Sequence, residues 1–389
     1  MVEAALVVSV LYALTILGFT FGWFRIKRWK CDALASTKLS VVIPVRNEEE
    51  NIEKLLEDLA GQNYPFELFE VIVVDDHSTD GTVDVINRIK NQDARRKTQD
   101  ARRKTKYSIL NTQFFKLIKN DGEGKKAAIR MGVEMAQGDL IVTTDGDCRV
   151  GPEWLMNIAT YYEKYKPRLI SGPVVMEETS GLFRSFQSME FMSLVASGAG
   201  SIGIGMPIMC NGANLAFEKE AYLQASNEKD LKYASGDDIF LLLRIKKTFG
   251  RQSIRFLQSQ EAIVETHSKG SLRSYLKQRL RWVSKSKGYR DPVIISVALI
   301  VFLFNLSLIL CSILAHQSLE LSQVTAAMWL GKVVIDLPLI MGFSMFAKRD
   351  KIMGCYLIFA IGYVLFATVM AVVGNLPPGY SWKGRKVRN

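Results

Sequence analysis

The stretch Leu39-Ser-Val-Val-Ile-Pro44 is a short apolar run rich in β-branched residues, and it predicts a buried strand. A helix is expected next, because Asn47 is a suitable N-cap and Glu50 lies three residues later, as in a capping box. Apolar residues then keep helical spacing up to Gly61, at Ile52, Leu55, Leu56 and Leu59. This stretch therefore predicts a strand followed by a helix.

The same alternation continues downstream. Strands are expected at 69–74, about 108–117 and 139–144, and helices at about 81–90 and 124–136. Alternating elements of this length predict an α/β domain with a mostly parallel sheet. Ligands of such sheets bind beyond the carboxyl ends of the strands, where the polar clusters of this sequence lie.

An uncharged apolar segment, residues 4–24, precedes the first strand and is long enough to span a membrane. The basic stretch 25–30 follows it, which predicts an anchor with its N-terminus outside and the next segment in the cytoplasm. Glu3 precedes the apolar segment and bulky aromatic residues end it, so we expect no signal-peptide cleavage.

Three more apolar stretches lie late in the chain, at 293–314, 325–346 and 352–374. The turn 348–351 is basic and is expected inside. Four full spans would place the basic tail, residues 376–389, outside, against the same rule. We therefore expect one late stretch to be re-entrant or interfacial, and the sequence leaves open which one.

The composition excludes a purely soluble domain. The 389 residues are 48% hydrophobic, which leaves room for one soluble domain of about 250 residues and several membrane spans. Five scattered cysteines without metal-ligand spacing fit a reducing compartment. The net charge of +11 is not arranged as a basic stripe interleaved with aromatic residues, so we expect attraction to anionic lipid and no nucleic-acid partner.

One heptapeptide, Gln92-Asp-Ala-Arg-Arg-Lys-Thr98, is repeated without change as residues 99–105. A single tandem copy is too short for a solenoid. It predicts a solvated helical extension or a flexible insertion, and contact with an anionic membrane or partner is the alternative. We assign it no catalytic role.

Acidic pairs follow two expected strands. Asp145 and Asp147 are spaced so that both carboxylates face the same way in an extended backbone, with Gly146 between them. Two such oxygen donors suit Mg²⁺ or Mn²⁺ together with substrate phosphates, although acids in loops at strand ends are common. Asp75 and Asp76 end another strand. Together with the polar residues 46–48, Asp75 and Asp76 would contact a nucleotide base and ribose. The alternative is that they are ordinary loop residues.

Two helix starts carry further candidates. The Gly122-Glu-Gly-Lys125 turn opens a helix, where backbone amides and Lys125 would meet a phosphate. Asp237 and Asp238 begin another helix, either as N-terminal helix acids or with one of them acting as a general base.

The segment Gln278-Arg-Leu-Arg-Trp282 lies shortly before the apolar stretch at 293. On a helix, Gln278, Arg281 and Trp282 project from one face and would hold a sugar ring and an anionic leaving group. The alternative is an amphipathic helix whose tryptophan and arginines anchor it at the membrane surface.

Taken in order, these pieces resemble the membrane-bound, inverting glycosyltransferases of family 2, which include cellulose, chitin, hyaluronan and poly-N-acetylglucosamine synthases and ceramide glucosyltransferases. The resemblance covers nearly the whole chain. It is carried by the segments 41–48, 73–82, 124–127, 145–147, 211–217, 236–238 and 278–282.

The resemblance implies a GT-A (Rossmann-like) catalytic domain that uses a nucleotide-sugar donor, commonly a UDP-sugar, with Mg²⁺ or Mn²⁺. Asp147 would hold the metal and Asp238 would be the catalytic base. The implied substrate-binding residues are Pro44, Glu48, Asp76, Lys125, Asp145, Asn214, Asp237, Gln278, Arg281 and Trp282. Asp237 stands where relatives more often have Glu, and Arg130 where many have Asn.

The resemblance also implies an integral membrane protein, in the bacterial inner membrane, with its catalytic domain in the cytoplasm. The expected divisions are an anchor at 1–30, the GT-A domain at 31–270, an amphipathic interface helix at 271–292, about three membrane segments at 293–375 and a basic tail at 376–389. The oligomeric state stays open.

The acceptor is undecided between a membrane lipid or glycolipid and a growing β-linked polysaccharide. Few membrane spans favour the lipid, because a secreted polymer needs a protein-lined channel. A catalytically silent membrane scaffold that kept the fold is an alternative from another class. Lys332 and Asp336 have helical spacing and could pair inside the membrane, near the acceptor or as a structural ion pair.

Overall fold

The computed structural model describes residues 2–97, 114–178, 180–225, 237–375, 380–382 and 385–387. Within these residues, seven strands form a central sheet in the order β3-β2-β1-β4-β8-β6-β9. Their bounds are β1 Leu39–Val45, β2 Phe69–Asp75, β3 Phe115–Lys119, β4 Leu140–Thr143, β6 Leu169–Ser171, β8 Leu215–Glu218 and β9 Ile254–Phe256. β8 runs antiparallel to both of its neighbours, and the other strand pairs are parallel.

Side chains of β1 alternate between two apolar layers, because successive residues of a strand point to opposite faces. Val41 and Ile43 belong to the apolar layer that includes residues of α2, α3 and α5, whereas Val42 belongs to the layer that includes residues of α4 and α8. The bounds of these helices are α2 Ile52–Ala60, α3 Thr82–Lys97, α4 Lys125–Met135, α5 Trp154–Tyr165 and α8 Asp237–Phe249. Strand β1 is buried on both faces, as its continuous apolar run predicted.

The other elements complete the described chain. A small sheet in the order β5-β10-β7 lies between the central sheet and the long helices. Its strands are β5 Arg149–Val150, β7 Val174–Met176 and β10 Val264–Thr266. The remaining helices are α1 Val2–Arg25, α6 Leu182–Gly203, α7 Lys219–Ala225, α9 Leu272–Ser284, α10 Pro292–Leu314, α11 Leu319–Phe346 and α12 Tyr356–Asn375, and β11 Tyr380–Trp382 pairs with β12 Arg385–Val387.

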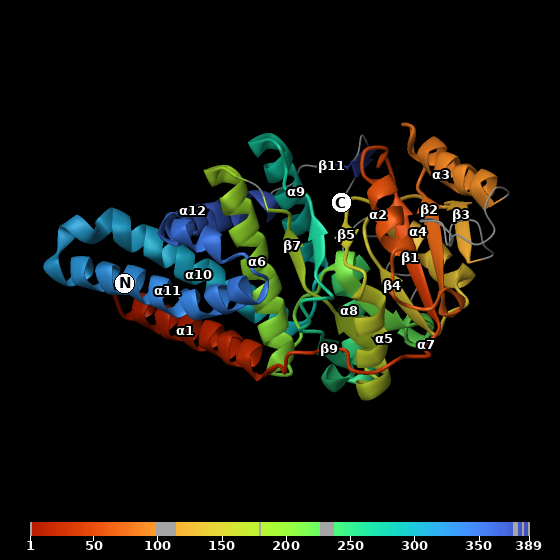
Figure 1. Cartoon of the computed structure of the whole chain (residues 1–389). Coiled ribbons are helices and arrows are strands. Elements are labelled where there is room, and N and C mark those ends of the chain that lie inside the picture. The colour runs from red at the N-terminus through yellow and green to blue at the C-terminus, as the bar shows by residue number, and fades with distance from the viewer. Residues whose placement is uncertain are drawn as a thin grey trace.

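Four of the described helices, α1, α10, α11 and α12, are long and apolar enough to cross a membrane. They gather at one end of the molecule, opposite the sheet, with α6 and α9 between the two parts (Figure 1). This arrangement indicates a membrane protein whose α/β domain lies outside the bilayer. It agrees with the expected apolar segments at both ends of the chain.

Helix α12 packs along α6 and α9. Its first half meets α6 through Phe359 and Phe186, whose ring centroids are 5.6 Å apart, and its second half meets α9 through Phe366 and Tyr275, at 5.3 Å. Near its end, Gly374 lies against a valine of α9. This packing joins α12 to both helices that lie between the α/β domain and the other membrane helices.

Helices α1 and α6 cross at glycines. A Cβ atom on Gly22 would overlap the carbonyl oxygen of Gly200, and one on Gly203 would overlap the carbonyl oxygen of Gly22. Only the absence of side chains lets the two backbones come this close. The crossing lies near the end of α1 that faces the α/β domain (Figure 1).

Lys332 is buried among the membrane helices and forms the expected ion pair. Its Nζ atom lies 2.8 Å from an Asp336 carboxylate oxygen and 2.9 Å from the Tyr12 hydroxyl, which in turn donates to Asp336 at 2.7 Å. The three groups join α1 to α11. Lys332 and Asp336 are absent from the lining of the large cavity described below, so the structure favours the structural alternative for this pair.

Several local expectations differ from the structure. Asn47 does not cap a helix: α2 begins at Ile52 after Asn51, while Asn47 has a φ of 54° and accepts a hydrogen bond from the Thr79 amide. The third strand covers 115–119, and the earlier part of its expected range lies outside the described residues. Helix α3 extends into the first copy of the heptapeptide, and the second copy also lies outside them. Helix α6 was not expected.

Candidate active site

A cavity of about 1130 Å³ lies between the carboxyl ends of the strands and the membrane helices. It collects residues that are far apart in the sequence: they lie at or just after the ends of β1, β2 and β4, begin α4 and α8, or lie in the second half of α9. Ten predicted site residues line it: Pro44, Glu48, Asp76, Lys125, Asp145, Asp147, Asp238, Gln278, Arg281 and Trp282. The topology of the sheet brings them together, since its parallel strands end at one edge.

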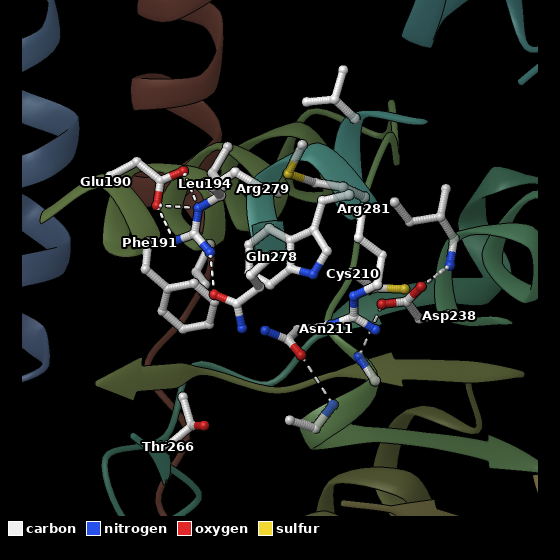
Figure 2. Close-up of a pocket in the computed structure, with 18 of the residues that line it drawn as sticks. Glu190, Phe191, Leu194, Cys210, Asn211, Asp238, Thr266, Gln278, Arg279 and Arg281 are labelled. Atoms are coloured by element: carbon white, nitrogen blue, oxygen red, sulfur yellow. Dashed lines mark hydrogen bonds and ion pairs between the residues drawn. The ribbon is translucent and has the colours of Figure 1, made fainter. Parts of the chain in front are cut away.

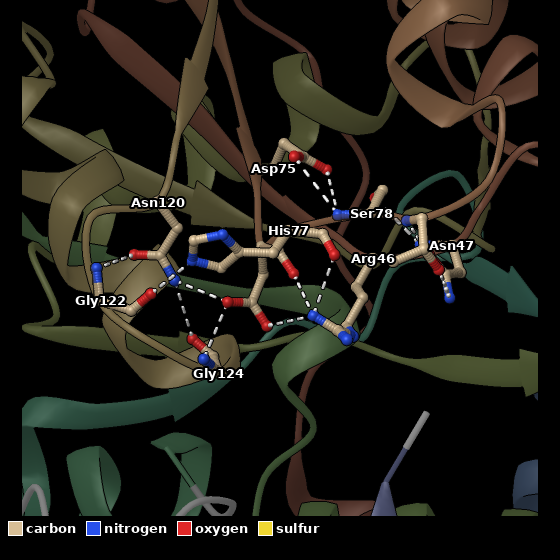
Figure 3. A network of polar contacts seen from close by, with 10 residues as sticks. Arg46, Asn47, Asp75, His77, Ser78, Asn120, Gly122 and Gly124 are labelled. Atoms are coloured by element: carbon tan, nitrogen blue, oxygen red, sulfur yellow. Dashed lines mark hydrogen bonds and ion pairs between the residues drawn. The ribbon is translucent and has the colours of Figure 1, made fainter. Parts of the chain in front are cut away.

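Asp76 is buried and organises one wall of this cavity. Its Oδ1 atom accepts hydrogen bonds from the Gly124 amide and the Asn120 side chain, both at 2.8 Å. Arg46 donates to the main-chain carbonyls of Asp76 and His77, at 2.6 and 3.1 Å. Figure 3 shows this network, which joins the ends of β1 and β2 to the loop before α4. The loop is thereby held in place, with Gly124 at a positive φ of 88°.

Asp145 and Asp147 both reach the cavity, and Lys125 forms an ion pair with Asp145. A Cβ atom on Gly146 would lie 3.0 Å from Glu48 Cγ, so the glycine lets this loop pass close over the end of β1. Two carboxylates facing one space suit Mg²⁺ or Mn²⁺, which in nucleotide sites complete their shell with phosphate oxygens and water. The residues present therefore fit a divalent cation that arrives with a phosphorylated substrate.

Asp238 lies in the first turn of α8. Its carboxylate accepts hydrogen bonds from the amides of Gly212, at 3.2 Å, and Ile239, at 2.8 Å. Figure 2 shows Asp238 on the same side of the cavity as Arg281. Burial and the nearby Asp238 carboxylate raise the pKa of Tyr289, so that hydroxyl stays neutral. The side chain of Asp237 lies outside the described residues.

Helix α9 presents Gln278, Arg281 and Trp282 to the cavity, as the helical spacing predicted. Arg279, next to Gln278, is 3% exposed and pairs with the equally buried Glu190 of α6, and both residues also line the cavity. The motif therefore lines the cavity and also anchors α9 to α6.

Comparison with known proteins identifies the family. Glycosyl transferase family 2 matches residues 40–219, and Glycosyl transferase family group 2 matches residues 140–372, which is more than half of the chain. The chain belongs to glycosyltransferase family 2. It is therefore a glycosyltransferase, as the resemblance implied.

Individual relatives of this glycosyltransferase match a limited part of it. Glycosyltransferase AglE of Haloferax volcanii is 35% identical over 117 residues, which are 30% of this chain and 33% of AglE. Dodecaprenyl-phosphate galacturonate synthase of Rhizobium johnstonii is 31% identical over 143 residues, or 36% of this chain and 37% of that protein. The chain thus spans about a third of the length of these curated relatives.

A solved structure resembles the glycosyltransferase over almost its whole length. It is a mannosyltransferase from Pyrobaculum calidifontis in complex with GDP-Man and Mn²⁺, with a TM-score of 0.55 and 19% sequence identity. The match covers 94% of this chain and 99% of that one. At this identity the likeness shows the fold, and it confirms the expected GT-A domain with its apolar helices.

Asn214 differs from its expected role as a substrate contact. It is 1% exposed and does not line the cavity. Its amide nitrogen donates to the carbonyls of Pro173 and Ala262, both at 2.8 Å, and its oxygen accepts from the Trp154 indole at 3.1 Å. Asn214 therefore ties together three segments behind the site of the glycosyltransferase.

The far end of the cavity is apolar and is formed by two membrane helices. One face of α10 and one face of α12 line it, and we call the space between them the apolar slot. The lining residues are Ile294, Ile295, Ala298, Leu299 and Phe302 of α10, and Tyr363, Phe366, Ala367, Met370 and Ala371 of α12. One continuous space thus joins the acidic residues of the glycosyltransferase to apolar side chains of two helices that are long and apolar enough to cross a membrane.

Glu190, Arg279 and the slot residues were not among the predicted site residues. A sequence signal exists for Glu190, because a lone acid in a long stretch of apolar and small residues needs a buried partner. The slot residues carry no such signal, since any membrane helix is apolar.

Proposed function

We propose that this enzyme transfers a sugar from a nucleotide-sugar, most simply a UDP-sugar, to a hydroxyl of a membrane lipid or glycolipid, with inversion at the anomeric carbon. The observation that carries this proposal is that one continuous cavity has an acidic end and an apolar slot. A polar nucleotide-sugar fits the acidic end, and a hydrocarbon chain fits the apolar slot.

The donor half follows from the strand ends. Pro44, Glu48 and Asp76 would surround the nucleoside, and Lys125 and Asp145 would face the phosphates. Asp147 would hold Mg²⁺ or Mn²⁺, which neutralises charge on a departing diphosphate. Arg281, which also lines the cavity, would add a second cation for the departing diphosphate. The mannosyltransferase from P. calidifontis was solved with a nucleotide-sugar and Mn²⁺, which agrees with this assignment.

Asp238 is the proposed general base. Its two hydrogen bonds leave carboxylate lone pairs able to accept a proton from an acceptor hydroxyl, since a carboxylate offers about four acceptor sites. Removal of that proton makes the oxygen a better nucleophile as it attacks the anomeric carbon. The nucleoside diphosphate leaves from the opposite face, which inverts the configuration. Trp282 and Gln278 would hold the acceptor beside Asp238.

The apolar slot supports a lipid acceptor over a growing polysaccharide. A polymer in transit needs hydroxyl-binding side chains along its path, whereas both helix faces of the slot are dominated by aliphatic and aromatic residues. One relative is named for a dodecaprenyl-phosphate product, which is a lipid. We further propose that the α/β domain lies on the cytoplasmic side of the plasma membrane, because the stretch 25–30 is basic.

The test is the mass of the product. Purified enzyme in membrane extract is given radiolabelled UDP-sugars or GDP-mannose with Mg²⁺ or Mn²⁺, and the labelled product is analysed by mass spectrometry. A single added sugar on a lipid supports the proposal. A ladder of masses supports polysaccharide synthesis, and neither transfer nor nucleotide release supports the silent scaffold.

A further inference from the structure

Helices α6 and α9 are joined by an ion pair that is almost completely buried. Glu190 of α6 accepts hydrogen bonds from the Arg279 Nε atom at 2.9 and 3.0 Å, and from Arg279 Nη2. The two side chains are 4% and 3% exposed. Burial raises the pKa of Glu190 even though the Arg279 charge lowers it. A pair that is costly to bury needs a reason beyond stability, because apolar residues would often stabilise as well.

Arg279 also contacts two side chains of the predicted acceptor site. Its Nη1 atom donates to the Gln278 Oε1 atom at 2.8 Å, and its guanidinium lies 4.1 Å from the centre of the Trp282 ring. Both contacts come from the same planar group, whose position is already fixed by Glu190. The orientation of Gln278 and Trp282 therefore depends on a residue in a different helix.

The contact with Arg279 decides which end of the Gln278 amide faces the cavity. Arginine has only donors, so the amide oxygen must turn to it and the amide nitrogen must turn away. Figure 2 shows this arrangement, with the nitrogen of Gln278 directed into the open space beside Asn211. Gln278 is thereby presented as a hydrogen-bond donor, which suits a hydroxyl or ring oxygen of a sugar.

We propose that Glu190 and Arg279 are positioning residues that orient the Gln278 amide and the Trp282 indole toward the acceptor. This inference rests on the proposed function, because it assumes that α9 contacts the acceptor. It extends the site to a helix that contributes no residue to the donor half. Binding of the nucleotide should not depend on the pair.

The experiment compares Glu190→Gln, Arg279→Lys and the double variant Glu190→Gln/Arg279→Met with wild type. For each, kcat and KM are measured against the acceptor that wild type glycosylates, and the Kd of UDP with Mn²⁺ is measured separately. Glu218→Gln is the matched control, because Glu218 pairs with Arg168 away from the cavity. Thermal unfolding in detergent reports whether each variant is folded.

We expect acceptor kcat/KM to fall about 100-fold in the pair variants, the loss typical of a displacement near 1 Å in a positioning group. The Kd of UDP should stay at the wild-type value, and Glu218→Gln should behave as wild type. The double variant is decisive, since removing both charges avoids an unpaired buried ion and should restore folding. If it is as active as wild type, the pair is only structural and the inference is wrong.

Failure of the proposed function gives a different result. A wild-type enzyme that extends a polysaccharide refutes the lipid acceptor, and the same kcat/KM comparison is then made with an oligosaccharide. If Glu190→Gln fails to fold, the double variant gives the answer by the same criterion. A UDP Kd that weakens together with kcat/KM would show general damage to the site and would also overturn the positioning role.

Discussion

Replacing Asp238 by asparagine tests the proposed base with the least change in shape. The carboxylate accepts from Ile239 at 2.8 Å and from Gly212 at 3.2 Å. An asparagine has one side-chain oxygen, so it can keep the shorter bond while its amino group turns toward the Gly212 N–H. This local mismatch costs about 1 kcal/mol, which is the usual net value of one hydrogen bond.

The larger effect is chemical. The amide of asparagine cannot take the proton from the hydroxyl group of the acceptor substrate. A positioned general base contributes a factor of about 10²–10⁴ to the rate. At 1.36 kcal/mol for each factor of ten, that loss raises the activation barrier by about 2.7–5.4 kcal/mol. The chemical term thus exceeds the structural one at both ends of the range. We expect kcat to fall by at least about 100-fold.

The assay is single-turnover transfer of radiolabelled sugar to the acceptor, with the Kd of UDP and the thermal midpoint measured on the same samples. The Kd of UDP and the thermal midpoint should both stay close to the wild-type values, because Asp238 does not contact the nucleotide-sugar in this mechanism. Glu218→Gln is the control, because Glu218 pairs with Arg168 and does not line the cavity. Asp238→Asn with more than a tenth of wild-type kcat, or an equal loss in Glu218→Gln, would refute the assignment.

Three further predictions address the metal, the apolar slot and the membrane helices. Asp147→Ala should reduce the rate of transfer at saturating donor by at least about 100-fold, which is the loss expected when a catalytic metal is removed. It should also weaken the Mn²⁺-dependent binding of UDP. If the Mn²⁺ dependence is unchanged, Asp147 is not the metal ligand. Ala298→Trp should fill the slot and raise acceptor KM at least tenfold with an unchanged Kd for UDP, whereas Leu330→Trp, on the exposed surface of α11, should have no effect. Lys332→Met should destabilise the protein by about 3 kcal/mol, because it leaves the Asp336 carboxylate buried without its cationic partner. Lys332→Met/Asp336→Leu should recover most of that stability, as measured by thermal unfolding in detergent. An equal loss of stability in the single and double variants would contradict this explanation.

Local patterns in the sequence were enough to predict most of the α/β domain. The strands β1, β2 and β4 and the helices α2 and α4 each bury a continuous or periodic set of apolar residues, which is visible within a short window. The residues at the strand ends then follow from the topology of a parallel sheet. The same reasoning placed Gln278, Arg281 and Trp282 on one helix face.

The features that could not be predicted depend on contacts between distant segments. Asn47 leaves the helical region because its side chain and backbone meet the loop after β2, about which a capping pattern says nothing. Glu190 and Arg279 are 89 residues apart, so the local pattern that requires a buried partner for Glu190 does not identify Arg279 as that partner. Helix α6 is rich in small residues and apolar on several sides, so it shows no helical periodicity.

The glycine crossing of α1 and α6 changes how the first helix should be regarded. A membrane anchor of the usual kind can be cut away to give a soluble enzyme. Here the removal of α1 would uncover the backbone of α6 at Gly200 and Gly203, on the same helix that carries Glu190 and lines the cavity. The first helix is thus part of the folding unit of the acceptor site, and a truncated protein that begins after it should retain the sheet and lose transfer.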